Sequence, residues 1–214
     1  MKLRNRSLPI FAMFLLGTAS LVGGCATTGM DRASSASGSI QDVDSEMRKM
    51  VVQIDLTSAS LESLVKPGQP DLEKAFDAYS DNVSKLENEG SRAVKRLDEM
   101  KLNSREYFAE WEKQGIAYKN PQIREQSEER RLKLSEIYAR IPAAGAGVKV
   151  SYLAAMSDLK EIRIYLSNDL TPKGVETITP VATKTIQDLE SLKISLHPVI
   201  TALDEIEPEL YGGK

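Results

Sequence analysis

The sequence predicts an all-α protein: an elongated antiparallel helical bundle with coiled-coil-like seams, after a signal peptide and a flexible tether. From Ile40 onward, apolar residues recur alternately three and four positions apart, which is the spacing of a coiled-coil seam. Aromatic residues make up only 6% of the 214 residues, and long β-branched runs are absent, which disfavours a sheet sandwich. Hydrophobic residues at 41% are enough for a folded body.

Residues 1–24 have the order of features that a bacterial signal peptide requires. The basic residues Lys2, Arg4 and Arg6 come first, and a short apolar core follows over residues 8–22. This core is shorter than the roughly 20 apolar residues that a membrane-spanning helix needs. We therefore expect residues 1–24 to be removed rather than to stay as a membrane span.

The apolar core ends in Leu21-Val22-Gly23-Gly24-Cys25, which resembles a bacterial lipobox. In such signals the cysteine thiol receives a diacylglyceryl group, and after cleavage its free amine is acylated as well. The resemblance implies that Cys25 carries acyl chains such as palmitate, which form a strong membrane anchor. It also implies the outer membrane, because Ala26 follows the cysteine rather than Asp. The alternative is an ordinary signal peptide with a chance cysteine.

Residues 25–39 are predicted to be a lipidated, flexible tether. Small and polar residues dominate the stretch TTGMDRASSASGS over 27–39, which has little apolar content to pack. The predicted domain organisation is therefore a signal peptide over 1–24, a tether over 25–39 and a coiled-coil helical bundle over 40–210.

The first two predicted helices are separated by a proline-rich corner. The first carries the seam Val43, Met47, Met50, Ile54, Thr57, Leu61 and Leu64. The string Lys66-Pro67-Gly68-Gln69-Pro70 ends it, and Asp71 can cap the next helix. That second helix carries the seam Leu72, Phe76, Tyr79, Val83, Leu86, Gly90, Ala93, Leu97 and Met100. The small residues Gly90 and Ala93 indicate either a close backbone approach or a soft point.

Later boundaries are marked by capping residues. Asn103 with Glu106 is predicted to open a third helix, which contains Phe108, Trp111 and Tyr118. Asn120-Pro121 is predicted to cap and begin a fourth helix, and Thr171-Pro172 to cap and begin the last. The fourth helix should kink or break briefly over 142–147, where Pro142, Gly145 and Gly147 lie. The last helix has the most regular seam, running from Ile178 to Ile206.

Signatures of catalysis are missing from the sequence. One histidine and one cysteine cannot form a zinc site, and no glycine-rich phosphate loop occurs, so we expect no metal and no cofactor. Carboxylates are plentiful, but on helices they are typical of a solvated face. The formal net charge is −3, and without residues 1–24 it is about −6, which argues against a nucleic-acid partner. We expect a protein that is not an enzyme.

One group of polar residues departs from ordinary bundle composition. Ser127 and Arg131 occupy seam positions where leucine would be expected. If the chain folds back at Asn120-Pro121, Trp111 as a large buried side chain approaches Arg131. Glu110 or Glu112 could then pair with Arg131 or Arg130 while the indole stacks on a guanidinium. We predict a polar seam cluster of Trp111, Glu110, Ser127, Arg130 and Arg131. The alternative is an open bundle in which Arg131 extends to solvent.

Three stretches resemble a bacterial envelope family known as the domain of unknown function 2959. They are NSREYFAEWEK over 103–113, QSEERR over 126–131 and SDLKEI over 157–162, followed by residues 165–171. The resemblance covers roughly Asp42 to Ile206. It implies a lipoprotein signal and a coiled-coil helical body, and it implies no activity.

These observations lead to two expectations of function. The first is a lipid-anchored envelope protein at the periplasmic face of the outer membrane, acting as a structural spacer, scaffold or interaction adaptor with protein partners. The alternative is a carrier of hydrophobic ligands or a periplasmic holdase, since Gly90, Ala93 and the break over 142–147 could open the bundle.

Overall fold

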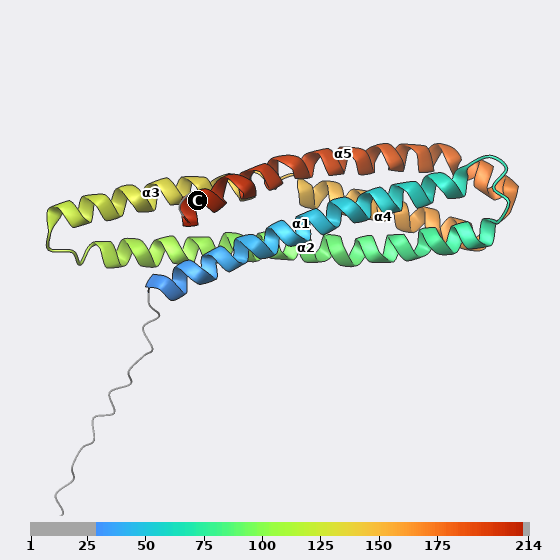
Figure 1. Ribbon diagram of the computed structural model, residues 1–214. Helices are drawn as coiled ribbons and strands as arrows, with labels where there is room; N and C mark the ends of the chain where they lie inside the picture. The colour runs from blue at the N-terminus through green and yellow to red at the C-terminus, as the bar shows by residue number, and fades with distance from the viewer. Residues whose placement is uncertain (1–28, 212–214) are drawn as a thin grey trace, which may run out of the picture.

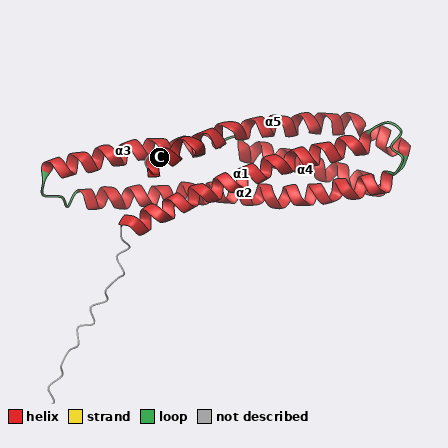
Figure 2. Cartoon of the chain, in the orientation of Figure 1, coloured by secondary structure: helices red, strands yellow, loops and turns green. Residues whose placement is uncertain are grey.

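The chain folds into a long rod of helices. The computed structural model describes residues 29–211, and within this range there are five helices and no strand. They are α1 (Gly29–Val65), α2 (Leu72–Gly115), α3 (Pro121–Ala144), α4 (Val148–Asn168) and α5 (Pro172–Tyr211). Figure 2 shows that short loops join these helices. The prediction of an elongated all-α protein is confirmed.

The helices form a bundle with four columns, and α3 and α4 share one of them. α1 packs against α2 and α5, while α2 and α5 each pack against both α3 and α4. In Figure 1, α3 and α4 follow one another along the rod and run opposite to α2 and α5. The predicted antiparallel arrangement is confirmed. Among the helices of residues 29–211, none is both long and apolar enough to cross a membrane.

A short break separates α3 from α4, as predicted for residues 142–147. Pro142 lies in the last turn of α3, where it removes a backbone donor, and Gly145 follows the end of the helix. A Cβ atom at Gly145 would lie 2.5 Å from Leu97 Cδ2, so the missing side chain leaves room for Leu97 to pack over the break. The column therefore continues through the break with its inner face covered.

Three of the predicted caps are confirmed. Asp71 accepts a hydrogen bond from the Lys74 backbone nitrogen at 3.0 Å. Asn120 caps α3, with Pro121 as the first helical residue. The Thr171 hydroxyl accepts from the Gly174 backbone nitrogen at 3.1 Å. Each cap satisfies a backbone donor that the first helical turn leaves unpaired.

The predicted helix start at Asn103 is wrong, because α2 continues through it to Gly115. Ser104 is buried and Phe108 packs against the core, so the inward-facing spacing of Met100 continues without a gap. The Ser104 hydroxyl donates to the Lys101 carbonyl at 3.1 Å, inside the helix. Asn103 and Glu106 could cap a helix, but neither is a proline or a glycine that would stop one. The packing of a continuous inward face therefore keeps α2 helical through them.

The predicted tether is also wrong for residues 29–39, which form the first turns of α1. Ala36 and Ser37 are buried there, and Ala36 belongs to the hydrophobic core. Alanine is the best helix former, so Ala33 and Ala36 favour a helix in this stretch. The folded body therefore includes residues 29–39 and does not begin at residue 40. Residues 25–28 lie outside the described part of the chain.

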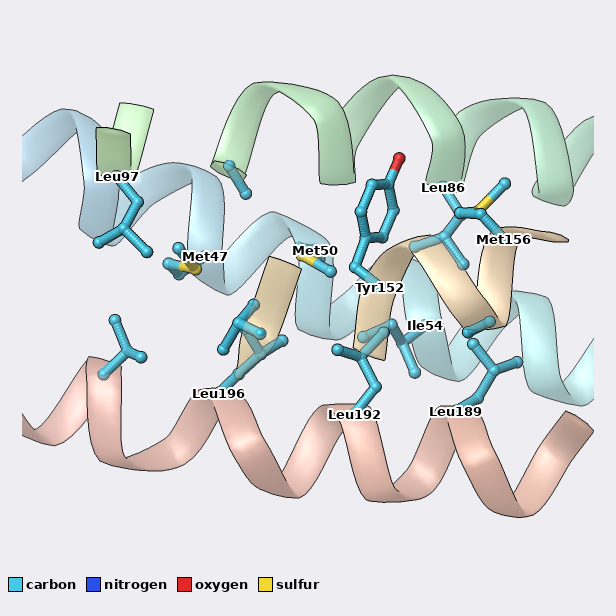
Figure 3. Packing of buried hydrophobic residues seen from close by; sticks show 14 of the residues in the cluster. Met47, Met50, Ile54, Leu86, Leu97, Tyr152, Met156, Leu189, Leu192 and Leu196 are labelled. Carbon is cyan, nitrogen blue, oxygen red and sulfur yellow. The ribbon is translucent and has the colours of Figure 1, made fainter. Parts of the chain in front are cut away.

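One hydrophobic core runs along the rod. Figure 3 shows its centre, where side chains of four helices interdigitate; those labelled are Met47, Met50, Ile54, Leu86, Leu97, Tyr152, Met156, Leu189, Leu192 and Leu196. Tyr79 is fully buried, and its hydroxyl donates to the Leu159 carbonyl at 2.7 Å. Burial raises the pKa of the Tyr79 phenol above its ordinary range.

Gly90 marks a close approach rather than a soft point. A Cβ atom at Gly90 would lie 2.1 Å from Tyr152 Cε2, so the α4 ring packs directly on the α2 backbone. The Tyr152 hydroxyl donates to the Glu87 carbonyl at 2.9 Å, which holds the ring in place. Of the two alternatives that the sequence left for Gly90, the structure shows the close backbone approach.

Candidate functional site

The end of the rod at the α2–α3 corner differs from the rest of the bundle. Between Ser104 on α2 and Leu134 on α3, no side chain is fully buried. We call residues 105–133 the arm, and the remaining described residues the body. In Figure 1 the arm extends past the start of α1 and the end of α5 as a hairpin of two helices. Because α2 and α3 have few other neighbours here, the side chains between them are only partly buried.

Aromatic side chains of α2 line the inner face of the arm. The Tyr107 ring centre lies 5.0 Å from that of Phe108 and 5.5 Å from that of Trp111. Phe108 also meets Tyr138 of α3 edge-on, with 5.2 Å between ring centres. This last contact joins the arm to the body, because Tyr138 is buried. Sequence reasoning missed Tyr107, although its i,i+4 spacing to Trp111 could have indicated the contact.

The corner at Asn120-Pro121 brings Trp111 and Ser127 together, as the polar seam prediction requires. The Trp111 Nε1 donates to the Ser127 hydroxyl at 2.9 Å. Both side chains are half-buried rather than buried, which corrects the expectation of a large buried tryptophan. A serine at this seam position supplies the acceptor that an indole needs when its nitrogen leaves water.

Arg131 pairs loosely with Glu112. Its guanidinium lies 3.8 Å from the Glu112 carboxylate, and the Arg131 side chain is 14% exposed whereas that of Glu112 is 62% exposed. The sequence left two alternatives for Arg131, a paired side chain or one that extends to solvent, and each is correct in part. The aliphatic stem is covered, and the charge reaches a partner at the surface.

Two members of the predicted cluster have other partners. Glu110 accepts from Gln114 at 3.0 Å and lies 3.7 Å from Lys113, so of the two carboxylates expected as possible partners of an arginine, Glu112 is the one that pairs with Arg131. The ring contacts of Trp111 are with Tyr107 and Phe108, in place of the expected guanidinium. Both sets of contacts have the same cause, because Glu110 and the Trp111 ring have nearer neighbours on α2 itself than on α3.

Arg130 reaches the end of α5. It donates to the Glu209 carbonyl at 2.5 Å, and Lys133 lies 3.0 Å from the Glu209 carboxylate. The Lys133 ammonium, with help from Arg130, holds the pKa of Glu209 below its ordinary value. The sequence offered no signal for this contact, because it joins residues far apart in the chain.

The start of α1 lies beside the arm. Arg32 donates to Gln114 at 2.8 Å. Gly29 and Arg32 line a surface hollow of about 510 Å³ together with Trp111, Tyr118 and Ile123. This contact was missed because residues 27–39 were expected to be a tether. It places the beginning of the described chain at the arm end of the rod.

The tip of the arm, residues 113–124, carries positive charge and exposed apolar groups. It contains three basic residues and no acidic one: Lys113, Lys119 and Arg124. Ile116 is 74% exposed, Ile123 is 49% exposed and Tyr118 is 38% exposed. Arg124 donates to the Tyr118 carbonyl at 2.7 Å, which ties the two sides of the corner together.

A second hollow, of about 370 Å³, lies at the opposite end of the rod. The α1–α2 loop and the start of α5 line it, with Val65, Leu72, Val175 and Pro180 among the apolar residues. Gly68 in this loop has a φ of 75°, which a residue with a side chain rarely adopts. We call this feature the distal hollow. The sequence indicated the proline-rich turn but not the space beside it.

The arm and the distal hollow can provide a ligand or partner with apolar contacts, hydrogen bonds and charged groups. Within residues 29–211, no group of three or more His, Cys, Asp and Glu side chains is placed to hold a metal ion. Cys25, the predicted lipidation site, lies outside the described residues and four positions before Gly29.

Comparison with known proteins gives one match. Neither the curated proteins nor the solved structures contain a match to this chain. A family model matches residues 30–206, which includes all of the arm and nearly all of the body. The match begins within the first turn of α1, in agreement with a folded body that includes residues 29–39. The chain belongs to the family of proteins of unknown function DUF2959.

Proposed function

We propose that this protein is a lipid-anchored, non-catalytic spacer and adaptor of the bacterial envelope. Acyl chains on Cys25 hold it to the periplasmic face of the outer membrane, and the rod presents a contact surface for protein partners at a distance. The lipobox-like string that ends at Cys25 supports the anchor. The rod supports the spacing role.

The observation that carries the proposal is the direction of α1. This helix begins beside the arm, four positions after Cys25, and runs to the distal hollow at the other end of the rod. Its 37 residues correspond to about 55 Å. An anchor at Cys25 therefore holds the rod by one end and lets the distal hollow stand up to about 55 Å further from the bilayer.

The core supports a rigid spacer. Side chains of α1, α2, α4 and α5 form one continuous cluster along the body, and Gly90 and Gly145 allow close packing instead of gaps. Packed interiors resist deformation, so the distance between the two ends is held by the whole bundle. The distal hollow, with its apolar lining, suits an apolar side chain of a partner protein.

The second candidate function is a carrier of a hydrophobic ligand. The distal hollow favours it, because about 370 Å³ falls within the range of small-molecule sites. The filled core favours the spacer. Binding of an apolar dye to the purified protein separates them: dye uptake that Val175→Trp abolishes supports the carrier, and no uptake supports the spacer.

Two measurements test the proposed function. Metabolic labelling with a palmitate analogue should mark the wild-type protein and not Cys25→Ser, and unchanged labelling of that variant would refute the anchor. A photo-crosslinking amino acid at Glu176, beside the distal hollow, should capture a defined protein in intact envelopes. The same amino acid at Val150, an exposed position along the rod, is the control. Equal capture from both positions would refute a distal contact.

A further inference from the structure

The tip of the arm has the composition of a surface that meets lipid. Ile116, Tyr118 and Ile123 are exposed within eight residues of one another. Other exposed aliphatic side chains, such as Val52, Val150 and Ile194, are spread along the sides of the rod. At the tip they occupy an extremity of the rod, where Ile116 borders one hollow and Tyr118 and Ile123 border another.

The charge of the tip differs in sign from that of the whole chain. Residues 113–124 contain three basic residues and no acidic one, whereas the formal net charge of the chain is −3. Basic side chains beside exposed apolar and aromatic ones are typical of elements that lie in a membrane interface, where the cations face anionic headgroups. Tyr118 and Trp111 have the amphipathic rings that concentrate at this depth.

The chain brings the predicted anchor to the same end. Gly29 lines the same hollow as Tyr118 and Ile123, and Arg32 donates to Gln114 one residue before α2 ends. Gly29 lies four positions after Cys25, a stretch that spans at most about 14 Å. A bilayer that holds the acyl chains of Cys25 therefore lies within reach of the tip.

We propose that residues 113–124 form a membrane-contact element that places Ile116, Tyr118 and Ile123 among the headgroups of an anionic bilayer. The inference rests on the proposed lipid anchor at Cys25. Acyl chains at one residue set the distance of the protein from the bilayer. A second contact, at the tip, sets the direction in which the rod points and keeps the distal hollow away from the surface.

The chain offers a direct test, because its only cysteine is Cys25. When lipid occupies that thiol, Ile116→Cys provides a single reactive site for a polarity-sensitive fluorophore. The full-length lipidated protein is reconstituted into vesicles of phosphatidylethanolamine and phosphatidylglycerol. Val150→Cys is the matched control, since Val150 is 71% exposed and Ile116 is 74% exposed.

We expect the fluorophore at position 116 to shift its emission to shorter wavelength and to be shielded from an aqueous quencher several-fold more than the one at position 150. Equal quenching at the two positions on vesicles that carry the protein would overturn the proposal. If position 116 remains in water here but crosslinks to a protein in intact envelopes, the tip binds a protein, and the proposal is wrong.

Vesicle flotation and the number of fluorophores per protein distinguish a failure of the tip contact from a failure of the lipid anchor. A second fluorophore on Cys25, or loss of flotation, would refute the lipid anchor. Flotation with one fluorophore and a water-exposed position 116 would refute the tip contact alone.

Charge reversal gives a second, independent readout. Lys119→Glu should reduce the shielding at position 116 at least two-fold on anionic vesicles. Lys85→Glu, at an exposed position of the body, should leave it unchanged. Identical shielding in the two variants, or in vesicles without phosphatidylglycerol, would contradict the role of the positive charge.

Discussion

The body and the arm follow the same alternation of three and four residues, but they bury those residues to different depths. On α2, the seam residues Val83, Leu86 and Met100 have no exposed surface, whereas Tyr107 and Trp111 on the same helix are half-buried. The body surrounds each seam with three other columns of helix, whereas in the arm the main neighbour of α2 is α3, and only the first turn of α1 and the last turn of α5 lie beside them. The spacing therefore defines which face of a helix points inward. The number of neighbouring helices determines how completely that face is covered.

The composition of the two regions follows from this difference. Apolar residues occupy most inward positions of the body, and the buried hydroxyls of Thr57 and Thr185 donate to carbonyls of their own helices. In the arm the inward positions include Trp111, Ser127 and Arg131, which each combine an apolar part with a polar end. Such side chains suit a face that is partly wet, because their polar ends keep a partner or reach solvent.

The largest difference should appear when a side chain is truncated in each region. Leu86→Ala removes a fully buried side chain and should lower the free energy of unfolding by about 3 kcal/mol. Trp111→Ala removes a larger but only partly buried side chain and should cost about 2 kcal/mol, because part of the indole already contacts water. Chemical denaturation of both variants provides the comparison. A larger loss for Trp111→Ala would contradict the difference in burial.

Two glycines of α2 should respond in opposite directions. Gly90→Ala places a Cβ atom against the Tyr152 ring and should destabilise the protein by about 2 kcal/mol. Gly115→Ala meets nothing within 4 Å and should stabilise it slightly, by up to about 1 kcal/mol, because alanine favours the helix. Thermal melts of the two variants measure both signs. A neutral Gly90→Ala would show that Tyr152 can move aside.

The smallest expected effect concerns the polar contacts of the arm. A double-mutant cycle on Trp111→Phe and Ser127→Ala should give a coupling of about 1 kcal/mol, because each single change removes the same hydrogen bond. A cycle on Trp111→Phe and Arg131→Leu should give less than about 0.5 kcal/mol, since Arg131 pairs with the exposed Glu112. If the second coupling exceeded the first, the assignment of partners would be wrong.

The sequence predicted the parts of the fold that depend on local chemistry. These parts follow from residues that are close together in the chain. They are the spacing of the seams, the break near Pro142, and the caps at Asp71, Asn120 and Thr171. The predicted hairpin at Asn120-Pro121 is present, but the residue expected opposite Trp111 was Arg131, and the hydrogen bond of the indole is to Ser127. These features could be predicted because each needs only a few neighbouring residues and the periodicity of the helix.

The errors arose where distant segments decide the outcome. Residues 29–39 resemble a linker by composition, and they are helical with Ala36 packed into the core. Asn103 resembles a cap, but packing on both sides of it carries α2 through. The contact between Arg130 and Glu209 depends on where α5 ends, which no local pattern indicates.

Native-state hydrogen exchange tests the central claim most directly, because α2 passes from the body into the arm without interruption. Because the amides compared belong to one uninterrupted helix, a change in their protection along α2 reports the packing around each part of it. We expect amides over 80–100 to exchange only through global unfolding. Amides over 107–115 and 124–131 should exchange through local opening, at least a hundred-fold faster. Uniform protection along α2 would contradict the account, because the arm would then unfold only together with the body.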